Sequence, residues 1–112
     1  MTKLEFLQKI KFYIKEIDRF NSELKSRFPN CENNLELRNF IDFSQNTKAD
    51  FLRKIEQYSN MSDESFSKIP TLDFMNKNAD SSFKSIELHY KTIINGPIYI
   101  YKPSDPNKKP IL

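Results

Sequence analysis

The stretch FLQKIKFYIKEIDRFNSEL, residues 6–24, decides the fold of this chain. Its apolar residues recur at spacings of three and four, the period of one face of an α-helix. Further apolar residues widen this face beyond a narrow seam, as is typical of a helix packed in a bundle. The recurring positions are Phe6, Ile10, Tyr13, Ile17, Phe20 and Leu24, widened by Leu7, Ile14 and Phe28. Such a face requires facing helices, and we expect Tyr13 and Ile17 to be among the most buried residues.

Capping signals fix the ends of this first helix. Thr2 is followed three residues later by Glu5, the spacing of a capping box, in which each side chain accepts a hydrogen bond from the other residue's backbone N–H. Pro29 and Asn30 end the helix, because proline cannot continue the backbone hydrogen-bond ladder.

A second helix is predicted to open at Asn33, with Glu36 as its capping partner, and to place Leu37, Phe40 and Ile41 inward. The polar stretch 44–48 interrupts the apolar pattern, and Thr47 with Asp50 repeats the capping signal. We therefore expect a kink or break there. The apolar spacing resumes with Phe51, Leu52, Ile55 and Tyr58.

Residues 61–78 are polar and contain Pro70, which indicates a connection with one or two brief helical turns. The last helix is predicted to start near Asp80 or Ser81 and to end at Gly96, with this glycine in the left-handed conformation of a helix cap. The fold class is therefore all-α. We expect a small antiparallel bundle of three main helices over residues 1–96, and an extended C-terminal arm over residues 97–112.

The arm, residues 97–112, carries the strongest partner-binding signal. Alternating Ile98, Tyr99, Ile100 and Tyr101 are too few to form a core, and Pro103, Pro106 and Pro110 forbid a helix. An extended segment with two different faces suits docking on another protein, so Ile98, Tyr99, Ile100, Tyr101 and Pro103 are the predicted partner-binding residues. The alternative is an edge strand or extended segment packed on the protein's own helices.

Composition and residue spacing argue against a catalytic, metal-binding, phosphate-binding or nucleic-acid-binding site. The formal net charge is +3, and the whole excess lies in residues 1–28, which contain seven basic and four acidic residues. Acidic residues are interspersed among the basic ones, which favours a solvated helix face over a nucleic-acid-binding stripe. Cys31 cannot form an internal disulfide, His89 has no metal ligand at helical spacing, and Gly96 is the only glycine, which excludes glycine-rich phosphate loops. We expect no catalytic residue, cofactor or metal.

Two segments resemble a known family. Phe12-Tyr13-Ile14, followed by Ile17 and Arg19, resembles the Leu-Tyr-Arg opening of the LYR-motif proteins, and residues 43–46 resemble the Phe-x-x-Asn stretch of their second helix. Ile14 stands where the family has its defining arginine, and residues 61–79 have no counterpart in its compact members. These proteins are small, basic and three-helical, and they serve in mitochondrial respiratory complexes and iron–sulfur assembly. The resemblance implies a helical accessory protein of mitochondria.

These observations predict a non-catalytic accessory or scaffold subunit of a large intracellular protein complex, with a mitochondrial membrane complex as the most specific version. No apolar run approaches the length of a membrane span, so the chain is expected to lie near a membrane without crossing it. The alternatives are a small regulator, inhibitor or toxin-like protein that acts as a monomer, and a peripheral membrane protein that uses the basic first helix.

Overall fold

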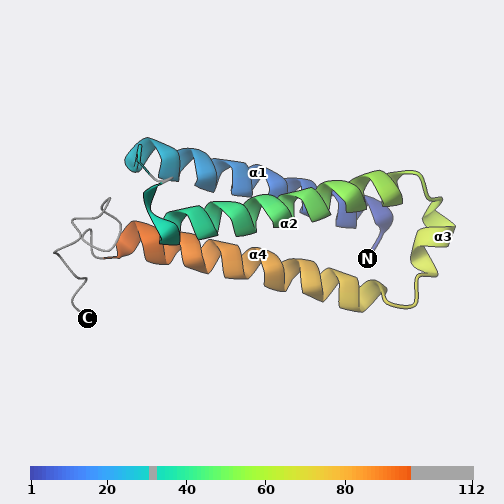
Figure 1. Ribbon diagram of the computed structural model, residues 1–112. Coiled ribbons are helices and arrows are strands. Elements are labelled where there is room, and N and C mark those ends of the chain that lie inside the picture. Colours follow the sequence, from blue (N-terminus) through green and yellow to red (C-terminus); the bar gives the residue numbers. More distant parts are fainter. Residues whose placement is uncertain (31–32, 97–112) are drawn as a thin grey trace.

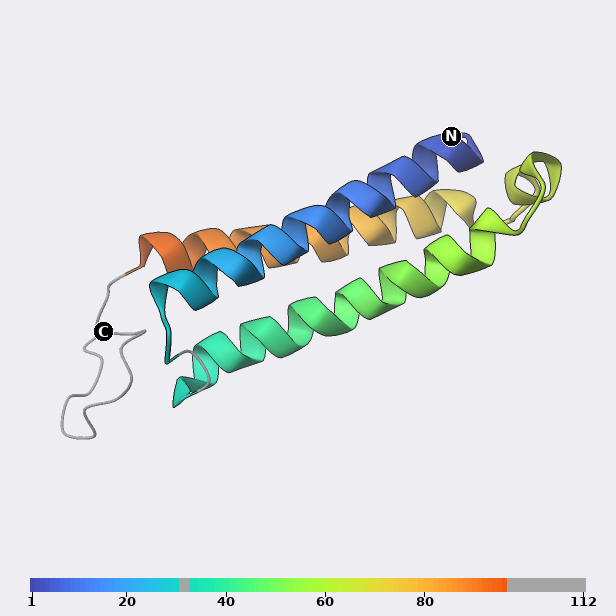
Figure 2. The ribbon, with the colours of Figure 1, turned by 90° about the horizontal axis from the view of Figure 1, so that it is seen from above.

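The computed structural model describes residues 1–30 and 33–96, which form an all-α bundle of three long helices and one short helix (Figure 1). The long helices are α1 (Lys3–Arg27), α2 (Leu35–Ser59) and α4 (Leu72–Asn95), and α3 (Asp63–Ser67) is a short helix in the connection between α2 and α4. The three long helices lie side by side in both views (Figures 1 and 2). α2 runs antiparallel to the other two, so α1 and α4 are parallel.

The core draws on all four helices. Sixteen of the described apolar residues are buried, and the largest fully buried side chains are phenylalanines. Burying each such side chain contributes roughly 1.5–3 kcal/mol, so these residues are the main source of stability. The buried set is Phe6, Leu7, Ile10, Ile17, Phe20, Leu24, Leu37, Phe40, Phe51, Tyr58, Phe66, Ala79, Phe83, Ile86, Tyr90 and Ile93.

The first helix is as predicted from the sequence. The capping box of Thr2 and Glu5 is present, and α1 ends at Arg27 with Phe28 as its C-cap. Ile17 is fully buried, as expected. The expectation for Tyr13 was wrong in degree, because its ring packs on the core while its hydroxyl reaches a polar partner at the edge, leaving the residue half-buried.

The predicted break in the second helix is wrong. α2 continues without interruption through the polar stretch 44–48 and is capped by Asn34, one residue later than predicted. The hydroxyl of Ser44 donates to the Ile41 carbonyl and that of Thr47 to the Phe43 carbonyl, both at 3.0 Å. These polar groups are therefore satisfied within the helix, and nothing forces the backbone to leave it.

The last helix begins earlier than predicted, at Leu72 instead of near Asp80. Leu72, Met75 and Ala79 continue the core spacing toward the N-terminus, and they pack on or within the core despite their polar neighbours. Gly96 has φ −78° and ψ 169°, which is extended backbone, so the prediction of a left-handed cap is also wrong.

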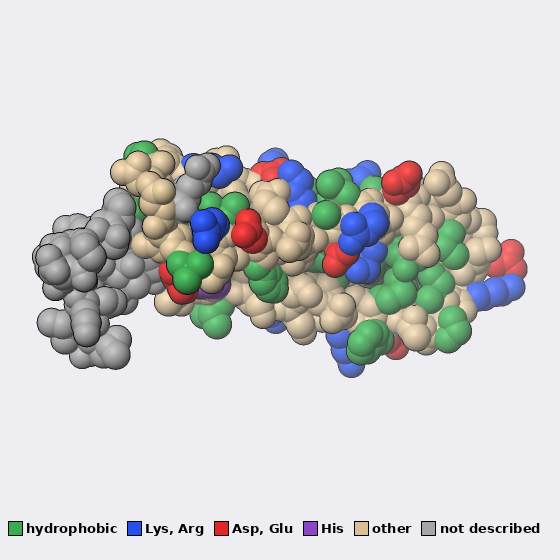
Figure 3. Space-filling view, viewed as in Figure 1, with side chains coloured by type: hydrophobic (Ala, Val, Ile, Leu, Met, Phe, Trp, Pro, Cys, Tyr) green, Lys and Arg blue, Asp and Glu red, His purple; other side chains and the backbone are tan. Residues whose placement is uncertain are grey.

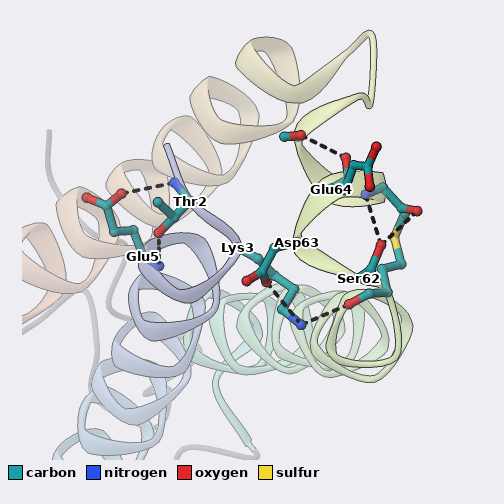
Figure 4. Close-up of polar contacts among 9 residues, drawn as sticks. Thr2, Lys3, Glu5, Ser62, Asp63 and Glu64 are labelled. Atoms are coloured by element: carbon teal, nitrogen blue, oxygen red, sulfur yellow. Dashed lines mark hydrogen bonds and ion pairs between the residues drawn. The ribbon is translucent and has the colours of Figure 1, made fainter.

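The short helix α3 closes one end of the bundle. Its Phe66 is fully buried, with its ring centroid 5.6 Å from that of Phe6 and 5.7 Å from that of Tyr58. Lys3 ties the start of α1 to the same end, because its Nζ donates to the Met61 carbonyl and lies 3.6 Å from the Asp63 carboxylate (Figure 4).

Candidate interaction surface

A polar network joins α1 to α4 at the edge of the core. The Tyr13 hydroxyl donates to Asp80 Oδ1 at 2.5 Å, and Lys9 Nζ lies 2.8 Å from the same oxygen. Lys9 also donates to Asn76 Oδ1. Burial raises the pKa of Asp80, but the hydrogen bonds from Lys9 and Tyr13 outweigh it and hold this pKa below its usual value. Burial and the hydrogen bond to the Asp80 carboxylate together raise the pKa of Tyr13, so at neutral pH the phenol is neutral and donates to an ionised Asp80.

A second polar contact lies inside the bundle, between α1 and α2. Asn21 is 4% exposed, and its Nδ2 donates to the Ile17 carbonyl at 2.9 Å and to Ser44 Oγ at 3.0 Å. Among the described residues, the Oδ1 of Asn21 is a buried side-chain oxygen without a hydrogen-bond partner. Asn21 is therefore a polar residue at a core position whose neighbours are apolar, and sequence reasoning did not single it out.

His89 and Cys31 are the two residues that the sequence analysis considered for metal binding or thiol chemistry. His89 connects α4 to the start of α2: its Nε2 lies 2.9 Å from Glu36 Oε1, and its ring packs edge-on against Phe40 at 5.3 Å. Both contacts link one helix to another. Cys31 lies outside the described residues.

The predicted partner-binding residues, Ile98, Tyr99, Ile100, Tyr101 and Pro103, also lie outside the described residues. Their role stays a prediction from the sequence.

The described residues present a different surface, which sequence reasoning missed. We define the α1–α2 strip as Leu4, Leu7, Ile14, Leu52 and Ile55, which follow the edge between α1 and α2. The strip's register is fixed by core pairs, because the ring of Tyr13 packs 6.0 Å from Phe51 and that of Phe6 packs 5.9 Å from Tyr58. Ile14 follows Tyr13 and Leu52 follows Phe51, so both turn toward the same outer edge.

Two members of the strip are exposed and the other three are recessed. Leu4 is 63% exposed and Leu52 is 49% exposed. Ile14 and Ile55 are partly buried against the core, and Leu7 is buried. On the α2 side of the molecule, hydrophobic side chains lie among basic and acidic ones along the upper half, where α1 and α2 run side by side (Figure 3). The sequence signal was present, since Leu4 precedes Leu7 by three residues and continues the widened face.

A shallow hollow lies on the same edge nearer the α1–α2 turn. It is lined by Lys25, Asn33, Arg38, Ile41 and Asp42. Between this hollow and the strip, Lys48 of α2 pairs with Asp18 of α1 at 2.7 Å. The edge between α1 and α2 is therefore apolar over one half and lined by charged residues of both signs over the other.

Within residues 1–30 and 33–96, no group of three or more His, Cys, Asp or Glu residues is placed to hold a metal ion. None of the helices in the described part of the chain combines the length and apolar character needed to cross a membrane.

Comparison with known proteins gives no relative for this chain: no family model, no curated protein and no solved structure matches it.

Proposed function

We propose that this chain is a non-catalytic accessory subunit that binds other proteins within a larger intracellular assembly. The observation that carries the proposal is the exposure of large apolar side chains on every long helix of a bundle whose core is already well filled. Eight such side chains are between 47% and 69% exposed: Met1, Leu4, Phe12, Leu35, Phe43, Leu52, Phe74 and Leu88. A contiguous exposed apolar patch marks a protein-binding surface, and Leu4 and Leu52 belong to the α1–α2 strip.

The polar side chains support the same proposal. Three groups that could take part in chemistry, Asp80, His89 and Asn21, each join one helix of the bundle to another. Interhelical polar contacts of this kind hold a scaffold in one arrangement. The most specific version we propose is a mitochondrial membrane complex, on the basis of the small size and the basic first helix.

In this proposal, the arm clamps neighbouring subunits through Ile98, Tyr99, Ile100 and Tyr101. Tyrosine offers a large contact area with only two side-chain torsions, so ordering it costs little entropy. The prolines restrict the free arm further and reduce the cost of ordering it on docking.

The test is native co-purification of the tagged full-length chain from its own cells. We expect a stoichiometric set of partner proteins, and we expect replacement of residues 98–101 by serine to remove that set. The matched control replaces Lys77 and Lys84 by serine, which changes the exposed side of α4 without removing an apolar side chain and should retain the set. A monomer with a measurable turnover in the wild-type preparation would refute the proposal in favour of a small enzyme or regulator.

A further inference from the structure

The α1–α2 strip lies beside the main concentration of positive charge in the molecule. α1 spans Lys3–Arg27 and contains seven basic and four acidic residues. Lys11 and Lys15 are exposed, at helical spacing from Leu4, Leu7 and Ile14 on this helix. Within the described part of the chain, neither lysine forms a hydrogen bond or a close ion pair, although Lys15 interacts electrostatically with Glu16, whose carboxylate is paired with Arg19. An apolar strip thus runs beside two lysines that are available to a partner.

The α2 side of the strip has a different charge. Arg53 is paired with Asp50 of its own helix, and Glu56 adds a negative charge close to Ile55. The unpaired positive charge beside the strip therefore belongs to α1. A complementary partner would carry apolar residues in its centre and acidic residues along the edge that faces α1.

We propose that the α1–α2 strip binds an amphipathic helix of a partner protein, with acidic residues along one edge, as a fourth helix of the bundle. From Leu4 to Ile14 the strip extends about 15 Å along α1, at ~1.5 Å per residue, which corresponds to roughly three turns of a partner helix. A helix laid on such a strip through residues three and four apart is a common mode of peptide recognition. This inference deepens the proposed function, on which it rests, by naming a partner class.

The exposure pattern favours a helix over a membrane surface. Side chains that anchor a protein in a bilayer protrude far enough to enter the acyl region. Here Ile14 and Ile55 are packed partly against the core and Leu7 is buried, so three of the five strip residues are recessed. Side chains of a partner helix can reach such recessed positions.

The test uses the full chain and a synthetic 18-residue amphipathic peptide with leucines at spacings of three and four and glutamates along one edge. Backbone amide chemical shifts of the chain are recorded during titration. We expect the changes to concentrate on Leu4, Ile14, Leu52 and Ile55. A control peptide with lysine in place of every glutamate should bind at least about tenfold more weakly.

Two double variants, which change the net charge by the same amount, test whether the lysines beside the strip contribute to binding. Replacing Lys11 and Lys15 by glutamate should weaken binding of the acidic peptide by about tenfold, which corresponds to ~1.4 kcal/mol. Replacing Lys77 and Lys84, two lysines on the exposed side of α4, by glutamate should leave the affinity unchanged. Equal binding of both peptides, shifts centred on another face, or no binding at millimolar peptide would overturn the inference.

Three further outcomes separate this inference from its alternatives. The chain could sediment with anionic phosphatidylserine vesicles, lose this binding in the Lys11 and Lys15 variant, and fail to bind the acidic peptide. These results together would identify a membrane, and not a partner helix, as the ligand of the strip. Self-association through the strip would replace it by a second copy. The variant with serine at 98–101 should bind the peptide normally, so a failure of the arm and a failure of the strip are distinguishable.

Discussion

The two interfaces of α1 differ in what accompanies their aromatic contacts. Toward α4 it presents a stack of aromatic rings: Tyr13 lies 4.2 Å from Phe83 at an angle of 7°, and Phe20 lies 4.2 Å from Tyr90 at 18°. Toward α2 it also makes an aromatic contact, between Phe6 and Tyr58 at 5.9 Å, and it adds the buried amide of Asn21, which is hydrogen-bonded to Ser44. The aromatic interface gains free energy from area and ring contacts. The amide gains less and restricts how α1 and α2 can align, as a buried polar residue does in a coiled coil.

The largest expected effect would break the aromatic interface. Phe20 is 1% exposed and its ring stacks on both Phe83 and Tyr90. Phe20→Ala should lower the free energy of unfolding by about 3–5 kcal/mol, since it removes both stacks and leaves a cavity. Chemical denaturation measures this loss.

The matched control for Phe20 is Phe12, on the same helix and 54% exposed. Phe12→Ala should change the free energy of unfolding by no more than about 0.5 kcal/mol. A loss for Phe20→Ala as small as this would show that the aromatic stack is not the main stabilising interface of α1.

In the interface with α2, removal of one polar partner should destabilise the bundle, whereas removal of both partners should restore its stability. Ser44→Ala should destabilise the bundle by about 1–2 kcal/mol, because it takes one acceptor from a buried amide that already has an unpartnered oxygen. Adding Asn21→Leu should recover that loss, since two apolar groups then pack without a desolvation penalty. A double-mutant cycle by chemical denaturation measures the coupling, and simple additivity would contradict it.

A smaller effect, dependent on pH, should come from the polar edge of the α4 interface. The pKa of Asp80 is lowered in the folded chain, so its contribution to stability is present at neutral pH and is lost as the pH falls below about 4, the ordinary range for aspartate. Asp80→Asn should therefore reduce the fall in melting temperature between pH 7 and pH 3. The control is Asp73→Asn, an exposed site on the same helix, which should retain the wild-type fall.

The smallest effect on stability is expected from removal of the arm. The described core lies between Phe6 and Ile93, so truncation after Gly96 should change the free energy of unfolding by no more than about 0.5 kcal/mol. Helicity and melting temperature by circular dichroism check this. Unfolding of the truncated chain would show that residues 97–112 brace the bundle, and would remove the reason to assign them to a partner.

The sequence predicted the helices where apolar spacing was uninterrupted and misjudged them where polar residues occupied the inner face. α1 followed directly from Phe6, Ile10 and Ile17. The stretch at Ser44 was interpreted as a break, although a serine can satisfy its own hydroxyl within a helix. The start of α4 was hidden by Asn76 and Asn78, and only the spacing of Leu72, Met75 and Ala79 marked it.

The surface was less predictable than the core for a physical reason. Exposure depends on which edges of three helices meet, and one helix pattern does not contain that information. Leu52 could be placed on an inward-facing pattern from the sequence, but its 49% exposure at the edge with α1 follows only from the bundle's register. The polar network of Lys9, Tyr13 and Asp80 likewise joins residues 67 or more positions apart in the chain.

The parallel arrangement of α1 and α4 has a consequence for the order of folding. Contacts between α1 and α2 join residues as close as 23 positions apart, such as Asn21 and Ser44, whereas Tyr13 and Asp80 are separated by 67. Loop closure is less costly for the nearer pair, so we expect the α1–α2 hairpin to form first and α4 to dock on it later. During synthesis, Phe20 would then face solvent until α4 has emerged, which makes the nascent hairpin a substrate for chaperones.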